Sequence, residues 1–492
     1  MKTHPLQSAR PLLVGVLALA LTACASSRGL QPQGRLLDMD GLQAGRSLAG
    51  DDLSASGFPA VDWWRALGDA QLDALVAEGL RNSPTLEVAD ARLRQAQAQV
   101  AGSKAERMPS LSVSPGYTGM RLPESMLGEA GGHYAGSVQT VLNFSYGVDL
   151  WGGKRAAWEA AVDSRHAAAV DAQAARLDLS AAIVQGYAQL AHAGALQRVA
   201  NDELARSEQL LQLTRQRRSA GIDSDLQVRQ AEARIPLARQ QQLAAQQQID
   251  AARNGLAALL GQGPDRGLQI AVPEVLSPLA LQLPGVLPSE LLGRRPDVVA
   301  ARWRVEASDK QIHVAKSHFY PSLNLMALGG VVSKDVGSLL ESGSTFGLLA
   351  PALSLPIFDG GRLRAGLAKS DADYDLAVAS YNTTVVQALR EVADQVNAVR
   401  SLATQVEAQQ QAVATAQSAN ALAQQRYRAG IGNYLDVLGT QDVLLQAQQR
   451  LSNLQSQQLL SSVQLSAALG GGYQPGDDAL PGTAKASDLP NS

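Results

Sequence analysis

Residues 296–323 (PDVVAARWRVEASDKQIHVAKSHFYPSL) repeat the pattern of residues 84–111 (PTLEVADARLRQAQAQVAGSKAERMPSL), and this repetition decides the fold. Both stretches begin at a proline, reach a lysine after the same number of residues and end in Pro-Ser-Leu. Later in each half, Gly152-Gly153-Lys154 matches Gly360-Gly361-Arg362. A period of about 210 residues is far longer than that of any solenoid repeat, so we interpret the chain as two equivalent halves. Such halves favour pseudo-symmetric rings and tubes.

The composition favours long helices and argues against nucleic-acid binding. The 492-residue chain has 4% aromatic and 18% charged residues, and Ala, Gln and Leu dominate the middle of each half. This composition is typical of long helices that pack through small residues. The net charge of −3, without a basic patch that carries interleaved aromatic residues, predicts no nucleic-acid partner.

The N-terminus has the pattern of a secretory signal. Lys2 and Arg10 form a positive region, and the apolar run from Pro11 to Leu21 is too short to span a membrane. The chain's one cysteine, Cys24, follows Leu-Thr-Ala, which resembles the bacterial lipobox, so we predict a diacylated Cys24 after cleavage. The alternative is an ordinary signal peptide with an incidental cysteine. Ala25 fits the outer-membrane sorting preference of such lipoproteins.

Period-two alternation predicts one strand hairpin in each half. In the first half, apolar residues alternate with small or polar ones over 138–150, and Leu111 and Val113 open the preceding strand. In the second half we predict strands over 323–329 and Phe346 to Phe358. These strands are long enough to cross a bilayer, which needs about 9–11 tilted residues. A soluble hairpin subdomain is the alternative.

Very long helices follow each hairpin. Proline is absent from Gly153 to Ser219 and from Gly361 to Arg428, and a 67-residue helix is roughly 100 Å long at a rise of 1.5 Å per residue. We expect Gly221 and Gly430 to end these helices in the left-handed conformation. Shorter helices are predicted near Ala70 to Arg81 and in both of the blocks that begin with proline. Beyond the N-terminal signal, no apolar run in the sequence approaches the length of a transmembrane helix.

The helices that return from each turn carry a heptad pattern at an offset of 209 residues. Small residues and glutamines in this pattern indicate close helix contacts that are partly wet. An antiparallel coiled coil closed within one subunit is the alternative. The residues are Ile235, Ala238, Gln242, Ala245, Ile249, Ala252, Leu256 and Leu259, then Leu444, Ala447, Leu451, Leu454, Gln458, Ser461, Leu465 and Ala468.

Four strands per chain require an oligomer. Four strands cannot close a barrel, and an open strand edge cannot face lipid because its backbone groups would lack partners. Two chains would supply eight strands and three would supply twelve. The elements therefore predict a lipid-embedded barrel that continues into a long helical tube.

The repeated blocks, the Gly-Gly junctions and the Arg-Ala-Gly-Ile turn before Asn433 to Leu438 resemble the TolC-type outer membrane factor family, from about Phe58 to Gly470. The lipobox points to its lipoprotein (NodT/OprM-like) branch of efflux outer membrane subunits. The resemblance implies an α+β membrane protein: a trimeric 12-stranded β-barrel, with four strands per chain, continuous with a 12-helix periplasmic α-barrel and an equatorial domain.

The same resemblance implies the function. It predicts the outer membrane channel of a tripartite efflux pump, which passively conducts small molecules such as drugs and toxic compounds. The implied partners are two further copies of the chain, a periplasmic membrane fusion adaptor, an inner membrane pump of the resistance-nodulation-division type, and outer membrane lipid. The alternatives are the duct of a type I protein secretion system and a lipid-anchored periplasmic coiled-coil scaffold without a pore.

The tips of the two helical hairpins are the predicted functional site. The resemblance places a periplasmic gate at Asp436, with Tyr434, Asp223 and Asp225 as further gate residues. Three copies would form rings of carboxylates that favour cations. The alternative for Asp436 is electrostatic stabilisation of its own helix N-terminus. One turn further on, where some family members carry a second Asp, this chain has Gly439, so one ring or two stays open. Predicted adaptor contacts flank the tips: Arg217, Gly221, Ile222, Arg426, Gly430 and Ile431.

No catalytic, metal-binding or cofactor-binding motif is found in the sequence, so we expect no enzyme activity. The six His are scattered, and His313 and His318 have the wrong spacing for one helical face. We expect Trp63 and Trp64 to pack in the equatorial belt. The alternative is a position at the membrane interface.

The predicted organisation has ten segments along the chain. They are a signal peptide (1–23), a lipidated tether (24–60), first-half equatorial and short helices (61–107), a first barrel hairpin (108–151), a first long helical hairpin (152–261), a linker with an equatorial segment (262–295), a second-half helix (296–319), a second barrel hairpin (320–359), a second long helical hairpin (360–470) and a C-terminal tail (471–492).

Overall fold

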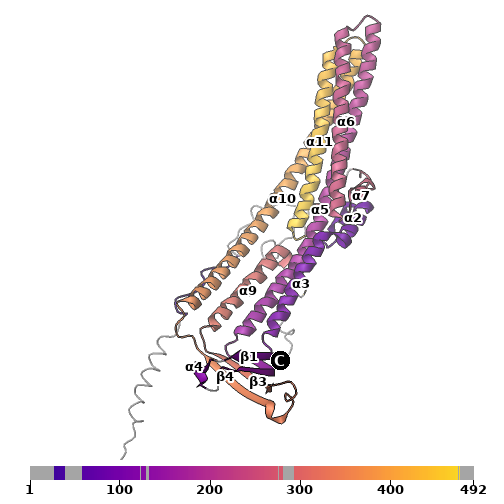
Figure 1. Ribbon diagram of the computed structural model, residues 1–492. Coiled ribbons are helices and arrows are strands. Elements are labelled where there is room, and N and C mark those ends of the chain that lie inside the picture. Colours follow the sequence, from indigo (N-terminus) through magenta and orange to yellow (C-terminus); the bar gives the residue numbers. More distant parts are fainter. Residues whose placement is uncertain are drawn as a thin grey trace, which may run out of the picture. The chain divides into compact units, whose positions relative to one another are not determined.

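The computed structural model describes residues 27–38, 58–121, 123–128, 132–274, 276–280, 293–474 and 476 (Figure 1). The predicted signal peptide, Cys24 and most of the C-terminal tail lie outside these residues. The helical elements are η1 (Trp63–Leu67), α2 (Ala70–Asn82), α3 (Pro84–Ala105), α4 (Glu124–Leu127), α5 (Gly153–Ser219), α6 (Asp225–Leu259), α7 (Pro264–Leu268), α9 (Pro296–Ser317), η3 (Ser342–Ser344), α10 (Arg362–Arg428) and α11 (Tyr434–Ala468).

The described residues group into two compact units. The first comprises residues up to 36 together with 93–168 and 301–381, and it holds the strands. The second comprises 37–92, 169–300 and 382 onward, and it holds α6 and α11. Helices α3, α5, α9 and α10 contribute residues to both units. The segment boundaries drawn from the sequence stay a prediction.

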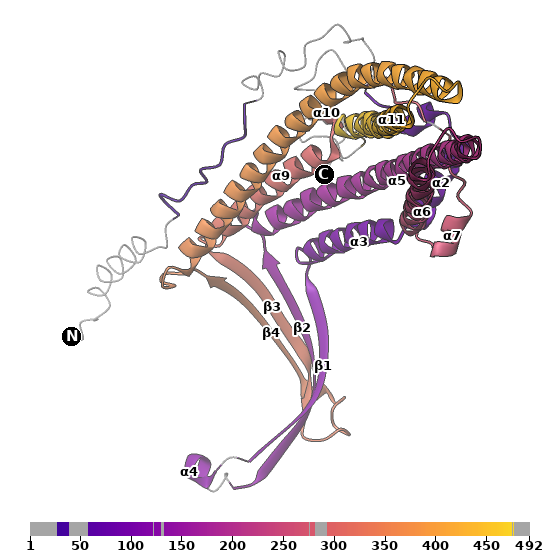
Figure 2. The same ribbon diagram turned by 90° about the horizontal axis from the view of Figure 1, so that it is seen from above.

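The strands of the described chain form one antiparallel sheet in the order β1-β2-β3-β4 (Figure 2). The two predicted hairpins are confirmed, and they join through the pairing of β2 with β3. The predicted end of the last strand at Phe358 is wrong, because β4 stops at Ser354. Pro356 follows, and its missing N–H cannot donate to a neighbouring strand. The strands are β1 (Ser110–Arg121), β2 (Tyr134–Val148), β3 (Ser322–Ser333) and β4 (Thr345–Ser354).

The register separates the residues of the sheet into two faces, and the first of them is the more apolar. Val113 pairs with Leu142, and Leu142 in turn pairs with Gly329, which places these residues on the same face. The neighbouring pair, Ser112 with Asn143, lies on the opposite face. Leu111, Phe144, Leu325 and Leu353 belong to the first face, and Ser114, Ser145, Asn324 and Ala352 to the second. The predicted alternation is therefore confirmed in β1 and β2, whereas the second face of β3 and β4 also carries apolar residues, among them Met326, Leu328, Phe346 and Leu348.

An aspartate shortly before each long helix accepts hydrogen bonds from backbone N–H groups at the start of that helix. The Asp149 carboxylate accepts hydrogen bonds from the N–H groups of Lys154 (3.1 Å) and Arg155 (2.8 Å) at the start of α5. Asp359 accepts from Gly361 (3.0 Å) and Leu363 (2.7 Å) at the start of α10. Because the first N–H groups of a helix have no partner within it, these carboxylates stabilise both strand-to-helix junctions. Both helices contain 67 residues, as the absence of proline predicts.

The heptad pattern is confirmed in α6 and α11, since every residue of both predicted series is buried or half-buried. Glutamine contacts between α5 and α6 fit the predicted partly wet seam. Gln197 donates to Gln246 at 2.7 Å, and Gln242 donates to Asn201 at 2.8 Å.

The core of the second unit lies around the two neighbouring tryptophans. Trp63 and Trp64 are 6% and 8% exposed and pack with Leu72, Ile183 and other apolar residues of α2, α5, α6 and α11. Burial in this core excludes the alternative position at a membrane interface. The prediction that these residues pack within the protein is confirmed.

Two adjacent glycines of β3 offer a matched test of the sheet. A Cβ atom on Gly330 would lie 2.1 Å from the carbonyl oxygen of Thr140, whereas one on Gly329 would meet its nearest atom at 3.9 Å. We expect Gly330→Ala to destabilise the sheet by roughly 2 kcal/mol or more, because the backbone of β2 must move. Gly329→Ala should leave the unfolding temperature unchanged. Equal thermal unfolding of both variants, followed by circular dichroism, would contradict this register.

Candidate functional site at the hairpin tips

Both hairpin tips use the same backbone turn. At the end of α5, Gly221 has φ 73°, its N–H donates to the carbonyl of Arg218, and the N–H of Ile222 donates to the carbonyl of Arg217. Gly430 (φ 81°) and Ile431 form the equivalent bonds at the end of α10. This is the Schellman arrangement, in which glycine adopts the left-handed conformation without steric cost. The predicted glycine caps are confirmed.

A buried ion pair within the α5–α6 tip contacts Tyr427 at the end of α10. The Arg217 Nε lies 3.0 Å from Asp223 Oδ2, and these side chains are 10% and 6% exposed. Arg217 also donates from Nη1 to the carbonyl of Tyr427 at 2.5 Å, and its guanidinium lies 4.2 Å from the Tyr427 ring centroid. The Tyr427 hydroxyl donates to Asp223. Arg217, Asp223 and Tyr427, the tip cluster, therefore connect the α5–α6 turn to the end of α10.

The tip cluster is electrostatically balanced and largely dry. The hydrogen bond to Asp223 is the main cause that raises the pKa of Arg217 above its ordinary value. Burial raises the pKa of Tyr434, which is 2% exposed, to about 12. The Tyr434 ring lies 5.9 Å from that of Tyr427. Two charges removed from water in this way hold each other in place, because either one alone would be strongly destabilising.

The repeat is broken at this cluster. At the 209-residue offset, Tyr427 and Tyr434 correspond to Arg218 and Asp225, which form an exposed ion pair at 2.5 Å. One half thus has an aromatic contact where the other half has opposite charges. Asp223 corresponds to Gly432, where an added Cβ would lie 2.8 Å from the Tyr427 nitrogen. No side chain fits at Gly432, so the second tip lacks the space for an equivalent carboxylate.

The structure separates the predicted gate residues into two groups. Asp223 and Tyr434 are buried in the protein, whereas Asp436 is exposed and the Asp225 side chain is 75% exposed. The N–H of Asn433 donates to Asp436 Oδ2 at 3.4 Å, so Asp436 caps its own helix. This is the alternative role considered for Asp436, and it leaves the carboxylate accessible.

The predicted adaptor contacts divide in the same way. Ile222 and Ile431 are 60% and 72% exposed, and Gly221, Gly430 and Arg426 are exposed as well. Arg217 is buried in the tip cluster, where its guanidinium binds within the chain. The exposed apolar surface of the tips therefore includes the two isoleucines, together with Leu226 and Leu435.

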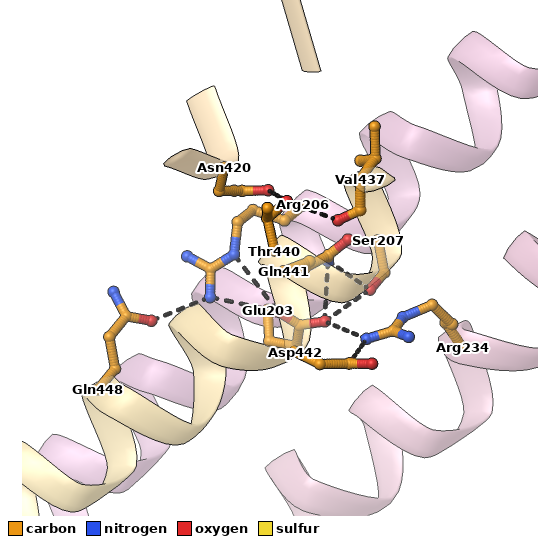
Figure 3. A network of polar contacts seen from close by, with 10 residues as sticks. All are labelled: Glu203, Arg206, Ser207, Arg234, Asn420, Val437, Thr440, Gln441, Asp442 and Gln448. Carbon is orange, nitrogen blue, oxygen red and sulfur yellow. Dashed lines mark hydrogen bonds and ion pairs between the residues drawn. The ribbon is translucent and has the colours of Figure 1, made fainter. Parts of the chain in front are cut away.

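A second polar network lies further along the hairpins and was not anticipated from the sequence (Figure 3). The Glu203 side chain, 4% exposed, accepts from Gln441 Nε2 (2.8 Å) and from Arg206 Nε (3.3 Å). Arg234 Nη2 lies 3.7 Å from Glu203 and also donates to Asp442. The network joins α5, α6 and α11. Its partners come from three separate helices, so no local spacing could reveal it.

Other classes of site are not found in the described part of the chain. Its helices include none that is long and apolar enough to cross a membrane. Among the same residues, no group of three or more His, Cys, Asp or Glu side chains is placed to hold a metal ion.

The described chain combines a four-stranded antiparallel sheet with two long helical hairpins, which is the architecture of solved outer membrane channel proteins. The sequence profile described as "outer membrane efflux protein" matches residues 75–262 and 287–471. The chain belongs to this family. The resemblance seen in the sequence, the α+β fold class of the trimeric TolC type, the outer membrane location and the role as an outer membrane component of efflux pumps are thereby confirmed.

Individual relatives agree with this assignment. Fusaric acid resistance protein FusA of Burkholderia cepacia is 37% identical over 374 residues, which are 74% of this chain and 70% of FusA. Pyoverdine export outer membrane protein OpmQ of Pseudomonas aeruginosa is 33% identical over 444 residues, 88% of this chain and 90% of OpmQ. The crystal structure of outer membrane protein VceC from Vibrio cholerae superposes with a TM-score of 0.79 at 37% identity, covering 85% of this chain and 100% of VceC.

Two aspartates at one tip test the cluster. Asp223→Asn should destabilise the tip by about 3 kcal/mol, because it leaves Arg217 buried without a carboxylate. Asp225→Asn removes only an exposed partner of Arg218 and should have no measurable effect. Hydrogen exchange of the amides of residues 210–226 measures the difference. Equal protection in both variants would show that the buried pair does not hold the tip.

Two glutamates of α5 test the second network. Glu203→Gln should lower the local stability by roughly 2–3 kcal/mol, since Arg206 and Arg234 lose their shared carboxylate. Glu208 is 53% exposed and lies 4.0 Å from Arg239, so Glu208→Gln is the control. Urea unfolding followed by circular dichroism compares them. A Glu203 variant as stable as the Glu208 variant would remove the network from the determinants of stability.

Proposed function

We propose that three copies of this chain form a passive duct for small molecules. The observation that carries the proposal is the sheet, which has one apolar face, an opposite face that is polar on β1 and β2, and two edge strands, β1 and β4, that are paired on one side in the described chain. In lipid, each edge must pair with a neighbouring copy. The apolar face then contacts lipid, and the polar face, with Ser112 and Asn143, lines the lumen.

The cargo is proposed from the names of the relatives, which state fusaric acid resistance and pyoverdine export, and the partners are proposed from the family resemblance of the sequence. The proposed cargo of this chain is small organic molecules of similar kind. An inner membrane pump of the resistance-nodulation-division type supplies the energy, and a periplasmic adaptor couples it to the duct. The chain itself performs no chemical reaction. A lipid on Cys24 adds an anchor in the outer membrane.

The tips form the periplasmic entrance in this proposal. Asp436 and Asp225 are accessible, so three copies would place carboxylate rings at the entrance. Asp223 and Tyr434 act indirectly, because the tip cluster holds the turn of one hairpin against the helix of the other. Opening the entrance requires the tips to separate, which the contacts of Arg217 and Asp223 with Tyr427 oppose. The exposed Ile222 and Ile431 contact the adaptor.

Planar-bilayer recordings test the duct and its gate. The purified protein should migrate as a heat-labile trimer and conduct ions. Asp436→Ala should raise the conductance of the closed channel about two-fold or more, because the smaller alanine side chains leave a wider constriction where three carboxylates had met. Asp250→Ala, on the exposed surface of α6, is the control.

The outcomes separate the possible functions. A monomer without conductance would overturn the duct and support a periplasmic scaffold. A conducting trimer that is unaffected by Asp436→Ala would remove Asp436 from the gate but leave the duct intact. Loss of protein secretion, without loss of small-molecule tolerance, in a deletion strain would support the duct of a type I secretion system instead.

A further inference from the structure

An exposed apolar surface continues past the ends of the strands. On β4, Leu349 and Leu353 belong to the apolar face and are 74% and 71% exposed. The same period of two continues beyond the strand through Leu355 and Ile357, which are 38% and 49% exposed. Phe358 follows and is 90% exposed. These three residues after Ser354, the β4 rim, extend the lipid-facing surface toward α10.

An aromatic pair lies at the neighbouring strand ends. Trp151 follows β2 and Tyr320 precedes β3, and their rings stack at 4.8 Å with an angle of 24°. Trp151 Nε1 donates to the carbonyl of Pro321 at 2.7 Å, so the indole N–H is satisfied although the side chain is about half exposed. Aromatic rings of this kind are enriched where a membrane surface meets water.

Positive charge accompanies the rim. Arg362 lines a hollow of about 430 Å³ between α9 and α10, together with His318 and Pro356. Asp359 lies near Arg362, but its carboxylate oxygens accept the backbone N–H groups of Gly361 and Leu363. Arg364 is a second arginine at this junction, and it donates to the carbonyl of Arg28. An arginine beside an apolar surface favours an anionic headgroup above acyl chains.

The first residues that the structure describes lie at the same junction. Residues 27–36 lie beside α10 (Figure 2), where the N–H groups of Gln33 and Gly34 donate to Asp375 Oδ1 at 2.8 and 2.6 Å. Leu30 packs on Phe319 and Leu363, and the carbonyl of Arg28 accepts from Arg364 at 3.3 Å. Four residues of chain reach at most about 14 Å, so an acyl group on Cys24 would enter the membrane close to this junction.

We propose that the β4 rim, the Trp151–Tyr320 pair and Arg362 form a binding surface for phospholipids of the periplasmic leaflet. Phe358 and Ile357 lie among acyl chains near the headgroups, and Arg362 contacts the lipid phosphate. The surface fixes the depth at which the barrel sits in the membrane. This inference relies on the outer membrane location and is independent of the cargo and of the gate.

A fluorescent label at the rim tests the surface. Phe358→Cys is labelled with bimane in the full-length trimer and reconstituted into vesicles whose lipids are brominated at a shallow or a deep acyl position. Shallow bromines should quench the rim label more strongly than deep ones. Leu243→Cys, 70% exposed on α6, is the control and should not be quenched. Unsubstituted protein, labelled in parallel, reports any signal from Cys24, the single cysteine of the chain.

The headgroup is tested in the same vesicles. Brominated phosphatidylglycerol should be enriched over brominated phosphatidylcholine at position 358 by about fivefold, as expected for one arginine near the membrane surface. Arg362→Gln should abolish that preference and leave the quenching by depth unchanged. A preference that persists in Arg362→Gln would overturn the phosphate contact.

Two results would overturn the lipid surface itself. One is a label at position 358 that is quenched no more than the label at 243. The other is a blue-shifted label without quenching by either bromine position, which would show that a second copy of the chain covers Phe358. Trimer formation and conductance, measured on the same samples, report the proposed duct separately.

Discussion

Backbone groups in lipid must find partners within the protein, and this constraint organises the whole chain. β2 and β3 are paired on both sides, but β1 and β4 are paired on one side in the described residues. A single chain in a membrane would therefore have unpaired backbone groups at both edges of its sheet. The apolar face makes it insoluble in water, and the free edges make it unstable in lipid. Assembly with identical copies pairs the edges, lipid covers the apolar face, and duplication of the half-domain supplies two hairpins per copy.

A different constraint applies to the helical hairpins, because water and not lipid surrounds them. Their seam of Ala and Gln buries little apolar surface, so specific polar contacts contribute to the alignment of the helices. Glu203 connects three helices, and the contacts of Arg217 and Asp223 with Tyr427 join the two tips. Buried ionic groups of this kind add little stability over apolar packing, but they tolerate few alternative registers. Specific polar contacts therefore align the helices of the hairpins at particular points along their length.

Much of the fold could be predicted from the sequence because its signals are local. Alternation located the strands, the absence of proline located α5 and α10, and Gly221 and Gly430 located the turns. The candidate site was only partly predictable. Tyr434 and Asp223 were singled out as gate groups, but their burial depends on Tyr427 and Arg217 from other turns of the fold. Glu203 was missed for the same reason, since its partners are distant in sequence. The end of β4 was misplaced because Leu355 and Ile357 keep the alternation without strand pairing.

The broken repeat at the tips also constrains how the two halves diverged. Arg218 and Asp225 in one half correspond to Tyr427 and Tyr434 in the other. A single substitution in either pair would place a tyrosine beside an arginine or an aspartate. One substitution therefore converts neither pair into the other. Conversion needs both substitutions, and the tyrosines also need the burial that the surrounding helices provide. After duplication, the two tips were therefore no longer interchangeable parts, and each could be selected for a separate task.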